Sequence, residues 1–301
     1  MILSGKGTRL LKSIRKRYFK DEFVLLWNLL YAFFAKSEKV NAKKARGEAL
    51  IAKDFNIVFE AMTDRLISDE KDSLPDGLRE QRDGKIIDHI YRDEAPFGKG
   101  QIYYIGDSKY YLDGNEIAGE SVYKQYTYAR NIIQECITLS YKAPEEYGRL
   151  GLRYRDESTE GYCPTPNFFI RGKFFAESDN PFSTTDLYIN KLPFCRRNDM
   201  QYQFPGRLFD RDTLILMTFE VNFLYILRAY TAGNDVSNAR AALRSRFRKG
   251  FSETLEELYD IRPLENATGD YIVRSFRELN GKVFYDNASG QFLLATAKTG
   301  K

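Results

Sequence analysis

The chain has 301 residues, 43% hydrophobic and 29% charged, which excludes a disordered protein, a collagen and a disulfide-stabilised mini-protein. Its single histidine, His89, excludes sites that need two, such as the HExxH zinc proteases, and its three cysteines form no C-x-x-C pair. The net charge of +4 is uneven, because residues 1–46 hold twelve Lys and Arg against three acids. That segment carries +9 and the remainder −5. Because the chain has one histidine and no C-x-x-C pair, carboxylates and lysines are the groups left for chemistry.

The first part of the chain has helical spacing. Over residues 8–36 apolar side chains recur at steps of three to four, with basic residues on another face. We therefore expect residues 1–47 to form a basic helical extension of the protein. Such an extension fits contact with nucleic acid, an anionic surface or a partner protein, and a solvated helical face fits it equally well.

Two apolar runs are candidates for membrane spans, and both fail. Residues 23–35 are shorter than the roughly 20 residues that cross a bilayer, and a long basic lead argues against a signal peptide. Residues 214–230 are longer but contain Glu220, Asn222 and Arg228. We expect both runs to be buried helices of a soluble, cytoplasmic protein without membrane contact.

The central part of the chain changes its period. Residues 48–69 carry an apolar stripe at helical spacing, and a breaker stretch follows at 73–77. Residues 85–91 and 101–111 are then rich in Ile and Tyr with a period of two, which predicts adjacent strands. Helical spacing returns over 120–140. The order helix, strand, strand, helix predicts an α/β core.

The remaining chain is predicted as short strands and loops over 141–210, helices over 212–232 and 236–249, and a short mixed tail from 260. The fold class is therefore α/β, a mixed sheet flanked by helices with helical parts at both ends. We expect a core over 48–210 and a helical C-terminal region over 211–301 that packs on it.

The sharpest chemical feature is Asp107-Ser108-Lys109 at the end of a predicted strand. Residues i and i+2 of a strand share a face, so Asp107 and Lys109 point the same way and Ser108 points the other way. A buried carboxylate beside an ammonium group is costly unless the two pair or something is bound there. An ion pair within the sheet is the structural alternative to a functional site.

A second carboxylate, Asp88, lies among isoleucines on the preceding strand. Two carboxylates on neighbouring strands can share Mg²⁺, which prefers oxygen ligands. A lysine beside that ion can lower the pKa of an attacking water or offset charge on a phosphate. His89 follows Asp88 but points to the opposite face, where a structural histidine is the expectation.

Two further positions fit this site. Glu60 lies in the helix before the strands and could supply a third carboxylate. Gln125 lies in the first turns of the helix after them and could reach a phosphate or orient the lysine. For each of the two, a solvent-facing side chain is the alternative.

These residues resemble the PD-(D/E)xK nuclease superfamily: Glu60, then Asp88, a 19-residue step to Asp107-Ser-Lys109, then Lys124-Gln125. The run IYYIGDSKYY followed by YKQYTYA is most similar to LlaJI-type and McrC-like restriction endonucleases, over about residues 50–140. The resemblance implies a restriction-endonuclease-like core that hydrolyses DNA phosphodiesters with Mg²⁺, or with Mn²⁺ in its place.

The resemblance also implies a role for each matched residue. The metal would be held by Glu60, Asp88, Asp107 and the Ser108 carbonyl. Lys109 would activate the attacking water, and Gln125 would position Lys109 or the phosphate. The first acid departs from the family pattern, because no proline precedes Asp88. A literal Pro75-Asp76 lies upstream before a turn, so Asp76 remains the alternative first acid.

We therefore expect a Mg²⁺-dependent DNA endonuclease, the cleavage subunit of a restriction or phage-defence system. The McrC-like resemblance implies a partner AAA+ GTPase, because residues 4–8 have the end of a phosphate-binding loop but lack the strand and first glycine before it. The alternative is a nuclease-like module that binds DNA or a partner without cutting. The sequence leaves a homo-oligomer open.

A second basic feature lies near the C-terminus. Arg240, Arg244 and Arg248 fall at i, i+4 and i+8, opposite an apolar stripe. Such a row predicts a clamp on the phosphate backbone of a duplex, since phosphate contacts dominate affinity for DNA. A solvated arginine face is an equal alternative.

Overall fold

A computed structural model describes residues 6–15, 20–39, 54–81, 84–97, 99–110, 117, 119–173, 189–191, 200–201, 206–231, 236–265, 267–287 and 289–298. The chain forms two compact units, Met1–Lys53 and Asp54–Lys301. The first division therefore falls after Lys53 rather than after residue 47. The second unit contains the expected boundary between residues 210 and 211, so that boundary does not separate compact units.

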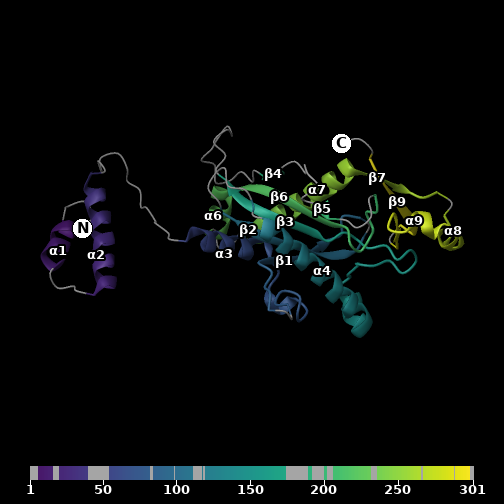
Figure 1. Cartoon of the computed structure of the whole chain (residues 1–301), viewed down its shortest axis with the longest axis horizontal. Helices are drawn as coiled ribbons and strands as arrows, with labels where there is room; N and C mark the ends of the chain where they lie inside the picture. Colours follow the sequence, from purple (N-terminus) through teal and green to yellow (C-terminus); the bar gives the residue numbers. More distant parts are fainter. Residues whose placement is uncertain are drawn as a thin grey trace. The chain divides into compact units, whose positions relative to one another are not determined.

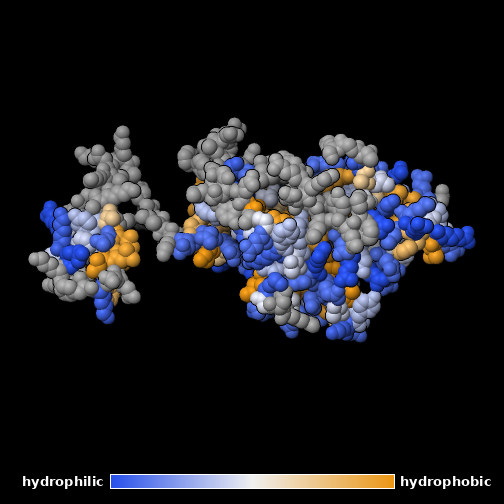
Figure 2. Space-filling model, in the orientation of Figure 1, coloured by the Kyte–Doolittle hydropathy of each residue, from blue (hydrophilic) through white to orange (hydrophobic). Residues whose placement is uncertain are grey.

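The first unit is a pair of helices, α1 (Lys6–Ile14) and α2 (Asp21–Lys39), where the spacing predicted a single helix. The indole nitrogen of Trp27 donates a hydrogen bond to the Leu11 carbonyl (2.7 Å), which joins the two helices. The expectation that residues 23–35 are buried is wrong within this unit. Leu25 and Leu29 are among several large apolar side chains of α2 that stay exposed, and Figure 2 shows apolar surface here.

The second unit is built on a mixed six-stranded sheet, which confirms the predicted α/β class with a mixed sheet flanked by helices (Figure 1). The strands are β1 (His89–Glu94), β2 (Gln101–Lys109), β3 (Pro166–Lys173), β4 (Ile189–Lys191), β5 (Met200–Gln201) and β6 (Leu214–Asn222). Their order is β1-β2-β3-β6-β4, and β5 also pairs with β6. Strands β2, β3 and β6 run parallel, whereas β1, β4 and β5 pair antiparallel to their neighbours.

Helices cover both faces of this sheet. They are α3 (Phe55–Ile67), α4 (Gly119–Lys142), α5 (Pro144–Arg149), α6 (Phe223–Thr231) and α7 (Val236–Leu258), with a short 3-10 turn at Lys71–Ser73. Consecutive residues of β3 identify the faces, because they point to opposite sides. The Asn167 side chain donates to the Gln125 carbonyl of α4, whereas Phe168 packs on Phe247 of α7. Helix α4 thus covers one face, and α7 covers the other together with α3.

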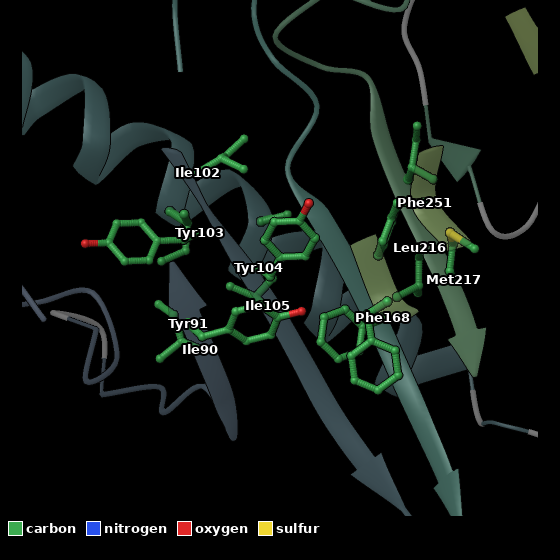
Figure 3. Close-up of a cluster of buried hydrophobic side chains, with 14 of the residues drawn as sticks. Ile90, Tyr91, Ile102, Tyr103, Tyr104, Ile105, Phe168, Leu216, Met217 and Phe251 are labelled. Atoms are coloured by element: carbon green, nitrogen blue, oxygen red, sulfur yellow. The ribbon is translucent and has the colours of Figure 1, made fainter. Parts of the chain in front are cut away.

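Aromatic side chains fill the core on the α7 face. Tyr91 and Tyr104 of the neighbouring strands β1 and β2 are stacked with ring centroids 5.1 Å apart, and Phe168 of β3 lies beside them (Figure 3). Gly106 is required in β2 because a Cβ at this position would overlap the Phe168 ring. This packing fixes the register of β1, β2 and β3. The register in turn positions the polar residues at the strand ends, such as Asp107 and Lys109 of β2.

The C-terminal tail forms a small sheet of its own. Its elements are β7 (Tyr259–Pro263), α8 (Gly269–Arg274), α9 (Phe276–Leu279), β8 (Val283–Asp286) and β9 (Gln291–Ala297). The three strands pair antiparallel in the order β7-β9-β8. Arg153 ties this sheet to the rest of the unit through an ion pair with Asp286 at 3.0 Å.

The predicted helix over 212–232 is wrong in its first half. Residues Leu214–Asn222 form β6, which lies between β3 and β4, and only Phe223–Thr231 are helical. A strand buried on both faces has a continuous apolar run instead of alternation, so its period did not reveal it. For the same reason the C-terminal region is not a separate helical part, because β6 belongs to the central sheet.

Other helices and strands begin or end a few residues away from their predicted boundaries. The strand expected over 85–91 is β1, His89–Glu94, and the helix expected over 236–249 continues to Leu258. The strand over 101–111 and the helix over 120–140 are found as β2 and α4. None of the helices in the described part of the chain combines the length and the apolar character that crossing a membrane needs.

Candidate active site

The pairing of β1 with β2 places two carboxylates opposite each other. His89 pairs with Gly106, so Asp88, one residue before β1, continues this register opposite Asp107. Residues opposite each other on antiparallel strands have Cβ atoms about 4.5–5.5 Å apart. Both carboxyl groups lie on the face that α4 covers, and Lys109 shares that face two residues further along β2.

The two carboxyl groups influence each other strongly. The pKa of Asp88 is raised from 3.8 to about 7, first because the group is buried. The charge of Asp107 and a hydrogen bond with Asp107 raise it further, and the charge of Glu60 adds to this. The positive charge of Lys124 acts in the other direction. A proton or a cation at Asp88 would relieve this repulsion.

Asp107 is fully buried, and Lys109 is its close counter-charge among the residues that the structure describes. The Lys109 ammonium lies 2.6 Å from Asp107 Oδ2, so the ion pair that we considered as a structural alternative is present. Neither oxygen of Asp107 accepts a hydrogen bond of good geometry, and its other polar contact is with the carboxyl group of Asp88. Buried acceptors of this kind normally have a partner, which can be an ion or a water.

Gln125 is a buried residue of α4 and does not face solvent. Neither the oxygen nor the nitrogen of its side-chain amide has a hydrogen-bond partner. Its backbone carbonyl accepts a hydrogen bond of 2.9 Å from Asn167 of β3, whose own side-chain oxygen is also buried and unpartnered. The site thus contains buried polar atoms from α4 and β3 in addition to the two acids.

Glu60 of α3 and Lys124 of α4 act on Asp88 through their charges. Glu60 of α3 is half-buried and close enough for its charge to raise the pKa of Asp88. Burial lowers the pKa of Lys124, but its hydrogen bond with Tyr128 and the charges of Asp88 and Asp107 raise it overall. The sequence motif assigns no role to Lys124, although this residue precedes Gln125 and lies one helical turn before Tyr128.

The metal-ligand set that the resemblance implied is only partly assembled. Within the described ranges, no three His, Cys, Asp or Glu side chains are placed to hold a metal ion together. Asp88 and Asp107 face each other, whereas Glu60 acts on them at longer range. Mg²⁺ is commonly bound by only one or two carboxylates with several waters, so two carboxylates are a sufficient protein contribution. The alternative acid, Asp76, is exposed in a turn.

Ser108 and His89 point away from this site, as the strand period predicted. His89 is fully buried on the α3 and α7 face, and its Nε2 lies 2.5 Å from the Ser108 hydroxyl oxygen. The Ser108 side chain is therefore engaged elsewhere, and only its backbone carbonyl is a candidate metal ligand.

The arginine row of α7, which the sequence predicts as a phosphate clamp, has partners within the chain. Arg244 donates to the Ile67 carbonyl (2.9 and 2.6 Å), pairs with Asp69 and stacks over the Tyr91 ring. Arg248 pairs with Asp93 and Glu94, and Arg240 donates to the Arg65 carbonyl. These guanidinium groups join α7 to the end of α3 and to β1. The local spacing could not show this, because the partners are distant in the sequence.

Comparison with known proteins does not identify a family. No protein-family model matches the chain, and no match was found among curated proteins or solved structures. The likeness to PD-(D/E)xK nucleases therefore remains a prediction from the sequence. What the chain can do has to be argued from the geometry of Asp88, Asp107, Lys109 and Gln125.

Proposed function

We propose that this protein is a Mg²⁺-dependent DNA endonuclease with a restriction-endonuclease-like core, and that it is the cleavage subunit of a restriction or phage-defence system. One observation carries the proposal. Two carboxyl groups on neighbouring strands, Asp88 and Asp107, face each other beside the Lys109 ammonium group. The class of DNA-cleaving enzyme follows from the resemblance of these residues, and the geometry is compatible with it.

The residues fit a divalent cation. The buried Asp107 carboxylate lacks a hydrogen bond of good geometry, and the raised pKa of Asp88 shows that burial and neighbouring charges disfavour a second negative charge there. Asp88, Asp107 and the Ser108 carbonyl would hold Mg²⁺ or Mn²⁺, with Glu60 acting through a bridging water. When bound, such an ion polarises the phosphate and lowers the pKa of a coordinated water.

The protein's own side chains have separate tasks in this proposal. Lys109 is ion-paired with Asp107 and presents positive charge where negative charge builds up on the scissile phosphate during in-line attack. Its ammonium hydrogens also orient the attacking water. The amide of Gln125 is buried and has no hydrogen-bond partner, and we assign it the task of positioning Lys109 or a phosphate oxygen. Lys124 adds a second positive charge near the acids.

A plasmid-nicking assay with Mg²⁺ tests the proposal. We expect Lys109→Ala and Asp107→Ala to reduce nicking by about 100-fold or more, the effect of removing a group that stabilises the transition state. Lys71→Ala is the matched control, because it removes an ion pair of the same length, 2.6 Å to Glu80, outside the site. Native-like nicking by both site variants would refute the assignment.

The chain resembles McrC-like subunits, so cleavage is expected to need a partner AAA+ GTPase. A blank assay with the isolated chain is therefore followed by calorimetry with Mn²⁺. We expect native protein to bind the ion and Asp88→Ala to lose that binding. DNA binding without any product, in the presence of Mg²⁺ and the partner, would instead indicate the non-cleaving module.

A further inference from the structure

The strands that carry the acids are joined on their other face by a buried side-chain network. His89 of β1 and Ser108 of β2 are in hydrogen-bond contact, 2.5 Å from Nε2 to Oγ. The other ring nitrogen of His89 lies 3.4 Å from Asp64 Oδ1 on α3. His89 follows Asp88, and Ser108 lies between Asp107 and Lys109, so each contact is one residue from the candidate site.

The charge of Asp64 determines the direction of these hydrogen bonds. Burial raises the pKa of Asp64, but hydrogen bonds from His89, Ser68 and Arg79 outweigh it and lower the pKa to about 2. An ionised Asp64 accepts a hydrogen bond from Nδ1–H of His89, and in a neutral ring Nε2 is then the acceptor for the Ser108 hydroxyl. The network therefore has a donor and an acceptor at every step.

Arg79 extends this network to the backbone of Asp88. Its guanidinium group donates to Asp64 Oδ2 at 2.8 Å and to the Asp88 carbonyl at 2.9 Å. Asp88 precedes the first paired residue of β1, so the paired ladder of β1 and β2 does not include it. The hydrogen bond from Arg79 supplies an anchor at this point.

We propose that Asp64, His89, Ser108 and Arg79 are positioning residues that hold the Asp88 backbone so that its carboxyl group faces Asp107. The inference rests on the proposed function only where it concerns metal binding. The connectivity is that of a Ser-His-Asp hydrolase, but a nucleophile must reach its substrate. His89 is fully buried and Ser108 is 7% exposed, so the hydroxyl group is engaged in structure.

The first test measures backbone order without metal or DNA. We expect Ser108→Ala and Arg79→Ala to speed amide hydrogen exchange at residues 88–90 by about tenfold or more, and Ser108→Thr to restore the native rate. Thr63→Val is the matched control, because it removes a buried hydroxyl that bonds only within α3, to the Phe59 carbonyl. Unchanged exchange in both alanine variants would overturn the proposal.

The second test measures Mn²⁺ affinity by calorimetry. Loss of residues that orient metal ligands typically costs 10- to 100-fold in affinity, which we expect for Ser108→Ala but not for Thr63→Val or Ser108→Thr. If the native protein binds no Mn²⁺, the proposed function fails while the exchange result still decides the positioning role. Covalent labelling of Ser108 by a fluorophosphonate would show an accessible nucleophile and would also overturn the proposal.

Discussion

Replacing Asp88 by asparagine should stabilise the folded protein at pH 8 while it removes metal binding. The native carboxyl group has its pKa raised from 3.8 to about 7, first by burial, then by the charge of Asp107 and a hydrogen bond with it, and then by the charge of Glu60. Each pH unit corresponds to about 1.4 kcal/mol, so the ionised group destabilises the fold by at most about 4 kcal/mol. Because the group is partly exposed, we expect a gain of roughly 2 kcal/mol from Asp88→Asn.

The sign of this effect depends on pH. The folded state binds the Asp88 proton more tightly than the unfolded state does, so this contribution to stability is complete below pH 3.8. It is lost as the pH rises towards about 7. The advantage of Asp88→Asn should therefore grow between these two values and stay constant above the second.

Urea unfolding in the presence of EDTA, at four values from pH 5 to pH 8, measures this difference. Asp76→Asn is the control, because Asp76 is exposed in a turn and its substitution should change stability little at any pH. Our account of the site would be refuted by an Asp88→Asn variant that is no more stable than native at pH 8. A gain that is the same at every pH would refute it too.

Four further predictions follow from other contacts. Mg²⁺ at 100 times its dissociation constant should stabilise the native protein by about 2.7 kcal/mol and leave Asp88→Asn unchanged in thermal melts. Arg244→Ala should lower the free energy of unfolding by about 2–4 kcal/mol without weakening DNA binding, because its contacts are internal. Gly106→Ala should destabilise by about 1–3 kcal/mol through overlap with Phe168, measured by urea unfolding. Gln125→Met should raise stability by about 1–2 kcal/mol but reduce nicking, since it removes a buried unpartnered amide.

The part of the fold that holds the site was predictable because its signals are local. The alternation of Ile and Tyr over residues 101–111 predicts strand β2, and the helical spacing of apolar residues over 120–140 predicts helix α4. A period of two also assigns Asp107 and Lys109 to one face and Ser108 to the other, and the contacts of Ser108 with His89 agree. Pairing of adjacent strands through a short connection then brings Asp88 near Asp107.

Other features depend on contacts between distant residues, which local patterns do not contain. Strand β6 has an apolar run that fits a buried helix or a buried strand, and only its pairing with β3 distinguishes them. Arg244 sits on a helical face that predicts a phosphate clamp, but its partners Ile67 and Asp69 lie far upstream. The contact of His89 with Asp64 was likewise not predicted, because the two residues are 25 positions apart and no local sequence pattern connects them.

Neighbouring residues of β1 and β2 differ in how well their polar groups are satisfied. On the α3 face, His89 and Ser108 have partners within hydrogen-bond distance. On the α4 face, Asp107 and the Gln125 amide lack a hydrogen bond of good geometry. A divalent cation and a phosphate on the α4 face would supply contacts to these groups, and this is the chemistry that the proposed function assigns to them.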